Sequence, residues 1–115
     1  MDTECNKLVR NRIPEILTQA GYTYDVATMS EEEYQQALRN KLVEEALEAA
    51  TASDTQQLIT EFADLYEVID TLMTSNYITH TMVRIEQGRR SQERGGFSQR
   101  IRLVRTISPP ATDSP

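Results

Sequence analysis

Two apolar stripes of helical spacing, separated by a short polar turn, constrain most strongly how this 115-residue chain folds. In the first stretch, residues 30–52, the stripe is formed by Tyr34, Leu38, Leu42 and Ala49. In the second, residues 54–75, spacings of four and three alternate along Leu58, Phe62, Leu65, Ile69 and Leu72. The intervening Ser53-Asp54-Thr55 has the composition of a turn and a helix N-cap. A chain reversal there predicts an antiparallel helical hairpin.

Acidic residues occur in both stretches at matching distances from this turn. Glu44-Glu45-x-x-Glu48 lies in the first stretch and Glu61-x-x-Asp64 in the second. Residues three apart share a helix face, so each stretch presents one carboxylate pair. Each pair lies about eight residues, or roughly 12 Å, from the turn, so the pairs should face each other. Glu45 falls inside the apolar stripe, where an unpaired carboxylate is costly.

Four clustered carboxylates repel one another unless a cation neutralises them. They form an all-oxygen site suited to a hard divalent ion, Mg²⁺ above all, with Mn²⁺ as a substitute. The alternative is a solvated acidic face with some salt bridges, where most helical Glu residues belong. The matched register of the two clusters favours a metal site.

Capping and breaking residues delimit the other elements. The predicted helices span residues 14–20, 30–52, 54–75 and 79–92, with a capping box at Ser30 and Glu33 and terminators at Gly21 and Gly95-Gly96. Residues 97–106 alternate in part between apolar and basic and predict a short extended C-terminal segment. The predicted fold is all-α, a bundle of three long helices plus a short one. Residues 1–107 form its one domain, and residues 108–115 are a disordered tail.

The second long helix carries one more stripe, made of Ile59, Tyr66 and Met73. Apolar residues therefore cover more than half of its circumference. A monomer of three or four helices cannot easily bury both stripes. We therefore predict self-association through these helices, as a homodimer or a homotetramer.

Charge is unevenly distributed along the chain. Residues 1–81 carry 5 Lys/Arg against 15 Asp/Glu, and residues 82–105 carry 7 Arg against 2 Glu. The net charge of −6 argues against binding to a nucleic-acid polymer. An acidic metal site and an arginine-rich segment suit a ligand that is both anionic and metal-bound, as nucleotide phosphates are. Alternatively, the two regions only pair electrostatically.

Cys5 is the only cysteine, which excludes an intramolecular disulfide. The sequence shows neither a signal-peptide pattern nor a long apolar run. These features predict a soluble, cytoplasmic protein with no membrane partner.

With these residues in view, the chain resembles the all-α nucleotide pyrophosphatase superfamily, often called MazG-like. Its EExxE and ExxD motifs correspond to the two acidic clusters. The closer resemblance is to the phosphoribosyl-ATP pyrophosphohydrolase-like branch, whose members typically begin with KLVRD-x-IPEI and end with RGGF-x-x-RI-x-L. Those segments match residues 7–16 and 94–103. Asn11 stands where the branch usually has Asp, and Arg90 where it usually has Lys, which bears on substrate choice more than on activity.

This resemblance implies a Mg²⁺-dependent hydrolase that cleaves a nucleoside triphosphate between its α and β phosphates. The products are a nucleoside monophosphate and pyrophosphate, and the role is house-cleaning of non-standard or surplus (d)NTPs. The implied metal ligands are Glu45, Glu48, Glu61 and Asp64. Glu44 would be the general base, or else a surface acid. The competing interpretations are a non-catalytic nucleotide-sensing module and a helical protein-interaction module.

Basic residues are the candidates for substrate binding. By resemblance, Lys7, Arg10 and Arg12 contact anions, with solvated surface as the alternative. Arg90 and Arg94 precede Gly95-Gly96, where the backbone can approach a phosphate closely. Their alternative role is to complement the helix dipole. Lys41, one turn before Glu45, can reach a phosphate, or it can pair with Glu45 and Glu48 when no metal is bound.

Overall fold

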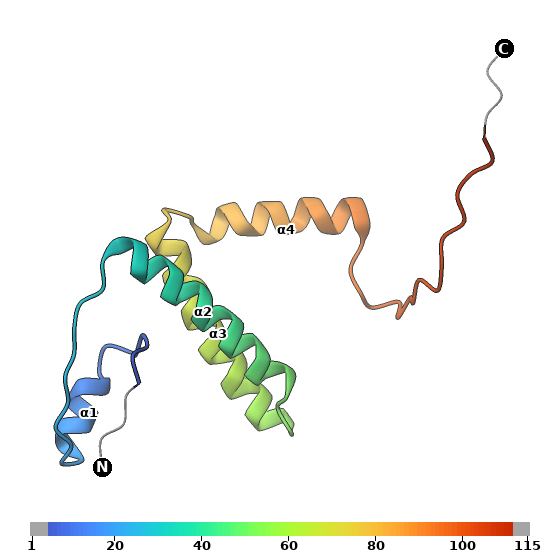
Figure 1. Ribbon diagram of the computed structural model, residues 1–115. Helices are drawn as coiled ribbons and strands as arrows, with labels where there is room; N and C mark the ends of the chain where they lie inside the picture. Colours follow the sequence, from blue (N-terminus) through green and yellow to red (C-terminus); the bar gives the residue numbers. More distant parts are fainter. Residues whose placement is uncertain (1–4, 112–115) are drawn as a thin grey trace. The chain divides into compact units, whose positions relative to one another are not determined.

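A computed structural model describes residues 5–111, and within that range it contains helices and no strand (Figure 1). The helices are α1 (Ile13–Gln19), α2 (Glu31–Ala50), α3 (Thr55–Ser75) and α4 (His80–Arg94). Their ends differ from the predicted ones by at most two residues. The all-α prediction, with three long helices and a short one, is therefore confirmed. The chain divides into two compact units, Met1–His80 and Thr81–Pro115.

Helices α2 and α3 pack side by side and run in opposite directions, which confirms the predicted hairpin (Figure 1). α2 begins with the predicted capping box, in which the Glu33 N–H donates to Ser30 Oγ and the Ser30 N–H donates to the Glu33 carboxylate. α3 begins at the predicted cap, where the Gln57 N–H donates to Asp54 Oδ1 at 2.7 Å. Local side-chain caps thus fix where α2 and α3 begin.

The hairpin core is thin. Leu38 and Met73 are the buried hydrophobic residues of the described chain, at 3% and 8% exposure. Most other members of the first two predicted stripes are half-buried: Tyr34, Leu42, Ala49, Leu58, Leu65, Ile69 and Leu72. Phe62, predicted to lie in the α3 stripe that faces α2, is instead 46% exposed. Of the second predicted stripe on α3, Met73 is buried, whereas Ile59 and Tyr66 are 54% and 67% exposed. The Ile78 N–H donates to the Met73 carbonyl at 2.9 Å, so the chain folds back over the last turn of α3.

The open end of the hairpin is joined by amide side chains. Gln35 Nε2 donates to Ser75 Oγ at 3.0 Å, and Asn76 Nδ2 donates to Gln35 Oε1 at 2.9 Å. These bonds link the first turns of α2 to the end of α3. The hairpin is therefore held at both ends, by the Asp54 cap at the turn and by Gln35 at the opening.

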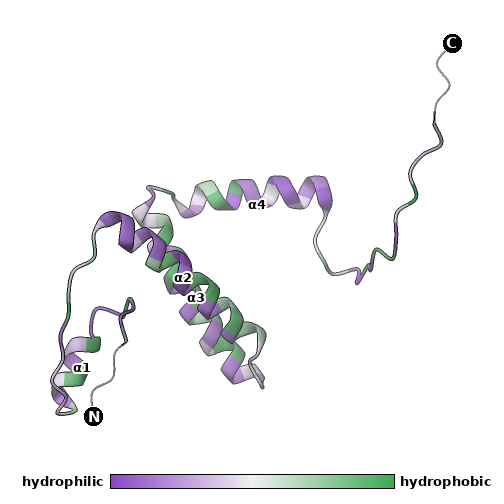
Figure 2. Cartoon of the chain, in the orientation of Figure 1, coloured by the Kyte–Doolittle hydropathy of each residue, from purple (hydrophilic) through white to green (hydrophobic). Residues whose placement is uncertain are grey.

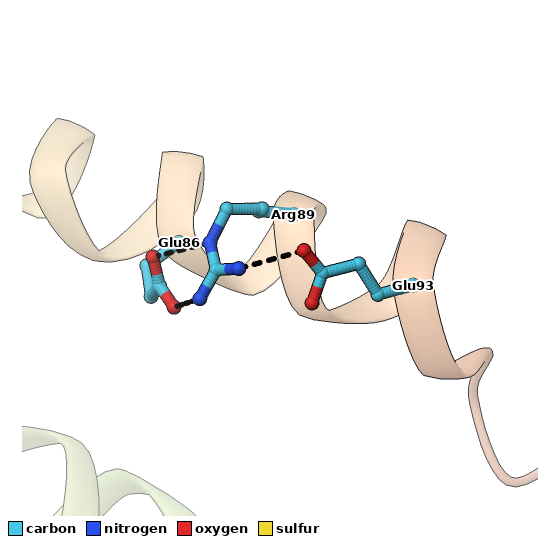
Figure 3. Close-up of polar contacts among 3 residues, drawn as sticks. All are labelled: Glu86, Arg89 and Glu93. Carbon is cyan, nitrogen blue, oxygen red and sulfur yellow. Dashed lines mark hydrogen bonds and ion pairs between the residues drawn. The ribbon is translucent and has the colours of Figure 1, made fainter. Parts of the chain in front are cut away.

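The second unit contains α4 and the chain that follows it. Every described side chain from residue 81 to residue 111 is exposed. α4 is stabilised along its own surface by Arg89, which pairs with Glu86 and donates to Glu93 Oε1 at 2.7 Å (Figure 3). Hydropathy along α4 falls from a mixed first half to a polar second half (Figure 2). Gly95, at φ +79°, ends the helix as predicted.

The segment after α4 begins with a turn. The Arg100 N–H donates to the Phe97 carbonyl at 3.3 Å, and Arg100 has φ +60°. The predicted extended conformation is therefore wrong for residues 97–100. Residues 101–111 belong to neither a helix nor a strand. Of the predicted tail, residues 112–115 lie outside the described residues.

None of the helices within residues 5–111 has the length and apolar content needed to cross a bilayer.

The α3 cap gives a direct test of the hairpin turn. Asp54→Ala should lower the free energy of unfolding by about 1 kcal/mol, because the Gln57 N–H loses its acceptor. Asp54→Asn is the matched control, since Asn caps helices about as well as Asp. Urea unfolding at one fixed protein concentration measures both variants. Equal losses in Ala and Asn would show that the cap does not stabilise the turn.

Candidate metal centre

Carboxylates from α2 and α3 meet where the two helices pack. Oxygen atoms of Glu45, Glu61 and Asp64 lie within 4.8 Å of one another. Oxygen atoms of Glu44, Glu45 and Glu48 do the same. Glu45 belongs to both groups and is the centre of the cluster. The two acidic motifs thus lie at the same height in the hairpin, as their spacing from the turn predicts.

Two oxygen atoms of this cluster are enclosed and lack a hydrogen-bond partner. They are Oε2 of Glu45 and Oε2 of Glu61, neither of which is bonded within residues 5–111. Both side chains are otherwise half-buried, as is Asp64, whereas Glu48 is exposed. An enclosed acceptor without a partner costs about 1–3 kcal/mol, and more when it is charged. A cation between the helices would satisfy both atoms at once.

The electrostatics of the cluster disfavour its fully ionised form. Burial raises the pKa of Glu45, and the nearby carboxylates of Glu48 and Asp64 raise it further. Burial also raises the pKa of Glu61, followed by its interactions with Glu48 and Asp64. A divalent cation at this position would oppose these shifts, because positive charge favours ionised carboxylates.

Lys41 lies beside the candidate base. Its Nζ is 3.4 Å from Glu44 Oε2, and its side chain is largely covered. Pairing with Glu45 and Glu48 was the alternative drawn from the sequence, but the ion pair is with Glu44. The charge of Lys41 still affects Glu45, because it partly offsets the rise in the pKa of Glu45. Lys41 therefore offsets part of the repulsion among the acids.

Arg10 reaches the cluster from the N-terminal segment. Its Nη2 lies 2.7 Å from Asp64 Oδ1, although the two residues are 54 positions apart. The resemblance implies that Arg10 contacts a substrate anion; in the structure its partner is a carboxylate of the acidic cluster. Both side chains are substantially exposed, so the pair adds little stability by itself. Its importance is positional, because it holds a guanidinium next to a candidate metal ligand.

The other predicted substrate-binding residues lie elsewhere. Arg12 pairs with Glu15 in the first turn of α1, at 3.1 Å. Lys7 is exposed and forms no ion pair within the described residues. Arg90 and Arg94 are exposed in the second unit, and neither forms an ion pair in the part of the chain that the structure describes. Their neighbour Arg89 instead forms ion pairs with Glu86 and Glu93 of α4 (Figure 3).

A shallow groove at the open end of the hairpin was missed by the sequence analysis. Its volume is about 350 Å³, and it is lined by Tyr34, Glu67, Asp70, Thr71, Thr74 and Ser75. Asp70 also accepts from His80 Nε2 at 3.2 Å. The spacing of polar residues along α3, at positions 67, 71 and 74, is the signal that could have predicted it.

Comparison of the chain with protein-family models, with curated proteins and with solved structures found no match. The fold and the site define an all-α protein whose central hairpin carries a carboxylate cluster between its helices.

Removing one charge from the centre of the cluster should stabilise the Mg²⁺-free protein at neutral pH. Folding raises the pKa of Glu45, so the folded state holds that proton more tightly than the unfolded state does. The resulting stability is fully present below the ordinary Glu pKa of about 4.3 and is lost as the pH rises through the raised pKa. Glu45→Gln mimics the protonated acid, so its advantage should appear at neutral pH and vanish in acid.

Urea unfolding with a chelator present, from acidic to neutral pH, measures this effect. The matched control is Glu67→Gln, which removes an exposed carboxylate from α3. A Glu45→Gln variant that is less stable than wild type at neutral pH would contradict the prediction. So would a pH dependence equal to that of the Glu67→Gln control.

Proposed function

We propose that this protein is a Mg²⁺-dependent nucleoside triphosphate pyrophosphohydrolase, acting between the α and β phosphates. The observation that carries the proposal is the pair of enclosed, unpartnered oxygens of Glu45 and Glu61, contributed by two different helices. Carboxylate oxygens of Glu45, Glu61 and Asp64 lie within 4.8 Å of one another, close enough to share one cation. The motif resemblance then supplies the class of reaction.

The donor set fits Mg²⁺. Its ligands would be Glu45, Glu48, Glu61 and Asp64, all carboxylates, and Mg²⁺ prefers hard oxygen ligands. Mn²⁺ accepts the same donors and is expected to substitute. The bound ion would neutralise phosphate charge and help to orient the attacking water. Because the ligands lie on two capped helices, their spacing is fixed before the ion arrives.

Glu44 is the proposed general base. Its carboxylate lies within 4.8 Å of those of Glu45 and Glu48, close enough to serve a water held at the same site. Glu44 would take one proton from that water as the water oxygen bonds to phosphorus. The bridging oxygen between the α and β phosphates then leaves, giving a nucleoside monophosphate and pyrophosphate. The Nζ of Lys41, 3.4 Å from Glu44 Oε2, would hold the Glu44 side chain in position beside the metal ligands.

Arg10 is the proposed phosphate contact nearest the metal ligands. A guanidinium that pairs with Asp64 can also pair with a phosphate oxygen brought to the same place. Lys7, Arg12, Arg90 and Arg94 remain substrate-binding candidates by resemblance. The proposed substrates are non-standard or surplus (d)NTPs, and the proposed location is the cytoplasm.

The Arg10–Asp64 pair also favours a second candidate function. An acidic face that binds an arginine of its own chain can bind a basic partner in the same way. The protein would then be a helical interaction module without catalytic activity. A nucleotide sensor is the intermediate case, in which Mg²⁺-nucleotide binds without turnover.

Pyrophosphate release separates these functions. With Mg²⁺, wild-type protein should release pyrophosphate from at least one member of a panel of standard and modified NTPs and dNTPs. Glu45→Ala should abolish the release, because it removes the carboxylate shared by both groups of the cluster. Nucleotide binding without release would establish a sensor, and neither binding nor release would establish an interaction module.

A conservative change at the base should separate chemistry from binding. Glu44→Gln should lower kcat by about 10²–10⁴-fold, because Gln cannot accept the proton. The affinity for Mg²⁺-nucleotide, measured by calorimetry, should stay close to that of wild type. A Glu44→Gln enzyme with unchanged kcat would remove Glu44 from the catalytic role.

A further inference from the structure

The chain that precedes α2 is held weakly to the rest of its unit. Residues 5–29, which we call the N-terminal segment, contain no buried side chain. The helix within it, α1, has 7 residues, too few for a helix to be stable in water by itself. It also lacks the extensive packing that joins α2 to α3. A specific contact is therefore needed to keep this segment against the hairpin.

Arg10 makes such a contact with the acidic cluster. Its Nη2 lies 2.7 Å from Asp64 Oδ1 on α3, within the same compact unit. The backbone of Arg10 is in turn tied to α1, because the Ile13 N–H donates to the Arg10 carbonyl at 3.1 Å. Holding the guanidinium at Asp64 therefore also holds the beginning of α1 there.

The carboxylate that binds Arg10 is also a candidate metal ligand. Oxygen atoms of Asp64, Glu45 and Glu61 lie within 4.8 Å of one another. A divalent cation among them would lie near the guanidinium, and two positive charges at short range repel each other. The cation would also be attracted by the same negative charge that attracts Arg10. Cation binding and the docking of Arg10 are therefore opposed.

The ion pair is weak enough for a cation to displace it. The side chains of Arg10 and Asp64 are 60% and 36% exposed, and exposed ion pairs contribute little to stability. The enclosed oxygens of Glu45 and Glu61 have no partner within the described residues, so Arg10 does not satisfy them. A cation that reaches these oxygens gains interactions that the arginine does not make. The balance between the two therefore favours the cation.

We propose that Arg10 docks the N-terminal segment on the acidic cluster while no cation is bound, and that a divalent cation entering the cluster releases the segment. By linkage, the cation weakens docking by the same factor by which docking weakens cation binding. The inference rests on the metal site of the proposed function and not on hydrolysis. A protein that binds Mn²⁺ but releases no pyrophosphate would therefore lose the proposed activity and retain this response.

Trypsin cleavage of the full chain measures the release directly, because trypsin must bind an arginine side chain in its specificity pocket. Cleavage after Arg10 should be about two- to fivefold faster with saturating Mg²⁺ than with a chelator, the range expected for loss of an exposed ion pair. Cleavage after Arg102, which is exposed and outside any helix, reports the activity of trypsin in the same digest. Asp64→Asn should give the faster rate without Mg²⁺, because a neutral amide forms no ion pair with the guanidinium.

The affinity for Mn²⁺, measured from the free Mn²⁺ signal in electron paramagnetic resonance, tests the reverse effect. Arg10→Gln should bind Mn²⁺ about two- to fivefold more tightly than wild type, and the gain should shrink as added salt screens the charges. The matched control is Arg12→Gln, which removes the same charge from the same segment. Because Arg12 pairs with Glu15 and not with the cluster, this variant should keep an affinity close to that of wild type.

Three results would overturn the proposal. The first is Mn²⁺ binding by wild type together with cleavage after Arg10 that does not respond to Mg²⁺, which would leave the metal site and remove the release. The second is weaker Mn²⁺ binding by Arg10→Gln than by wild type, since Arg10 would then support the site. The third is an absence of Mn²⁺ binding in wild type and Arg10→Gln alike, which would remove the metal site as well.

Discussion

The packing of α2 against α3 is the interaction on which the rest of this structure depends. Apolar residues spaced three and four apart bring the helices together, and the side-chain caps at Ser30 and Asp54 set where each helix starts. The packed interface between α2 and α3 also contains Glu45 and Glu61, each with one enclosed oxygen that has no partner among the described residues. A hairpin that needed only stability would place apolar side chains there. We propose that these carboxylates hold a cation between the two helices.

The carboxylates between α2 and α3 call for nearby positive charge, and two basic residues of the chain provide part of it. Lys41 pairs with Glu44, and Arg10 pairs with Asp64 from a distant part of the sequence. Neither contact reaches the enclosed oxygens of Glu45 and Glu61, so the centre of the cluster keeps its raised pKa values. A divalent cation is smaller than a lysine or arginine side chain, and we propose that it reaches these enclosed oxygens. A metal-bound nucleotide would then meet Arg10 and Lys41 as ready phosphate contacts.

The features that local periodicity specifies were predictable from the sequence. The hairpin, its two caps and the common height of the acidic motifs follow from spacing, because helix faces and turn chemistry are local properties. The contact between Arg10 and Asp64 was not predictable in this way, since nothing local links residues 54 positions apart. The exposure of Phe62, predicted as part of the α3 stripe that packs on α2, was also not predictable from spacing, because spacing does not show how far round each helix the packing extends. The turn at Phe97 was missed because Arg100 adopts positive φ, which a partly alternating pattern does not reveal.

Mn²⁺ binding to wild type and to Glu61→Gln, followed by electron paramagnetic resonance, tests whether the carboxylates between α2 and α3 form a metal site. Wild type should deplete the free Mn²⁺ signal, Mg²⁺ should compete for the same site, and Glu61→Gln should abolish both effects while the helices persist. Titrations with and without an NTP cover the case in which the nucleotide completes the coordination. Free Mn²⁺ that is unaffected by wild-type protein under both conditions would contradict the account and leave the carboxylates as a structural feature of the hairpin.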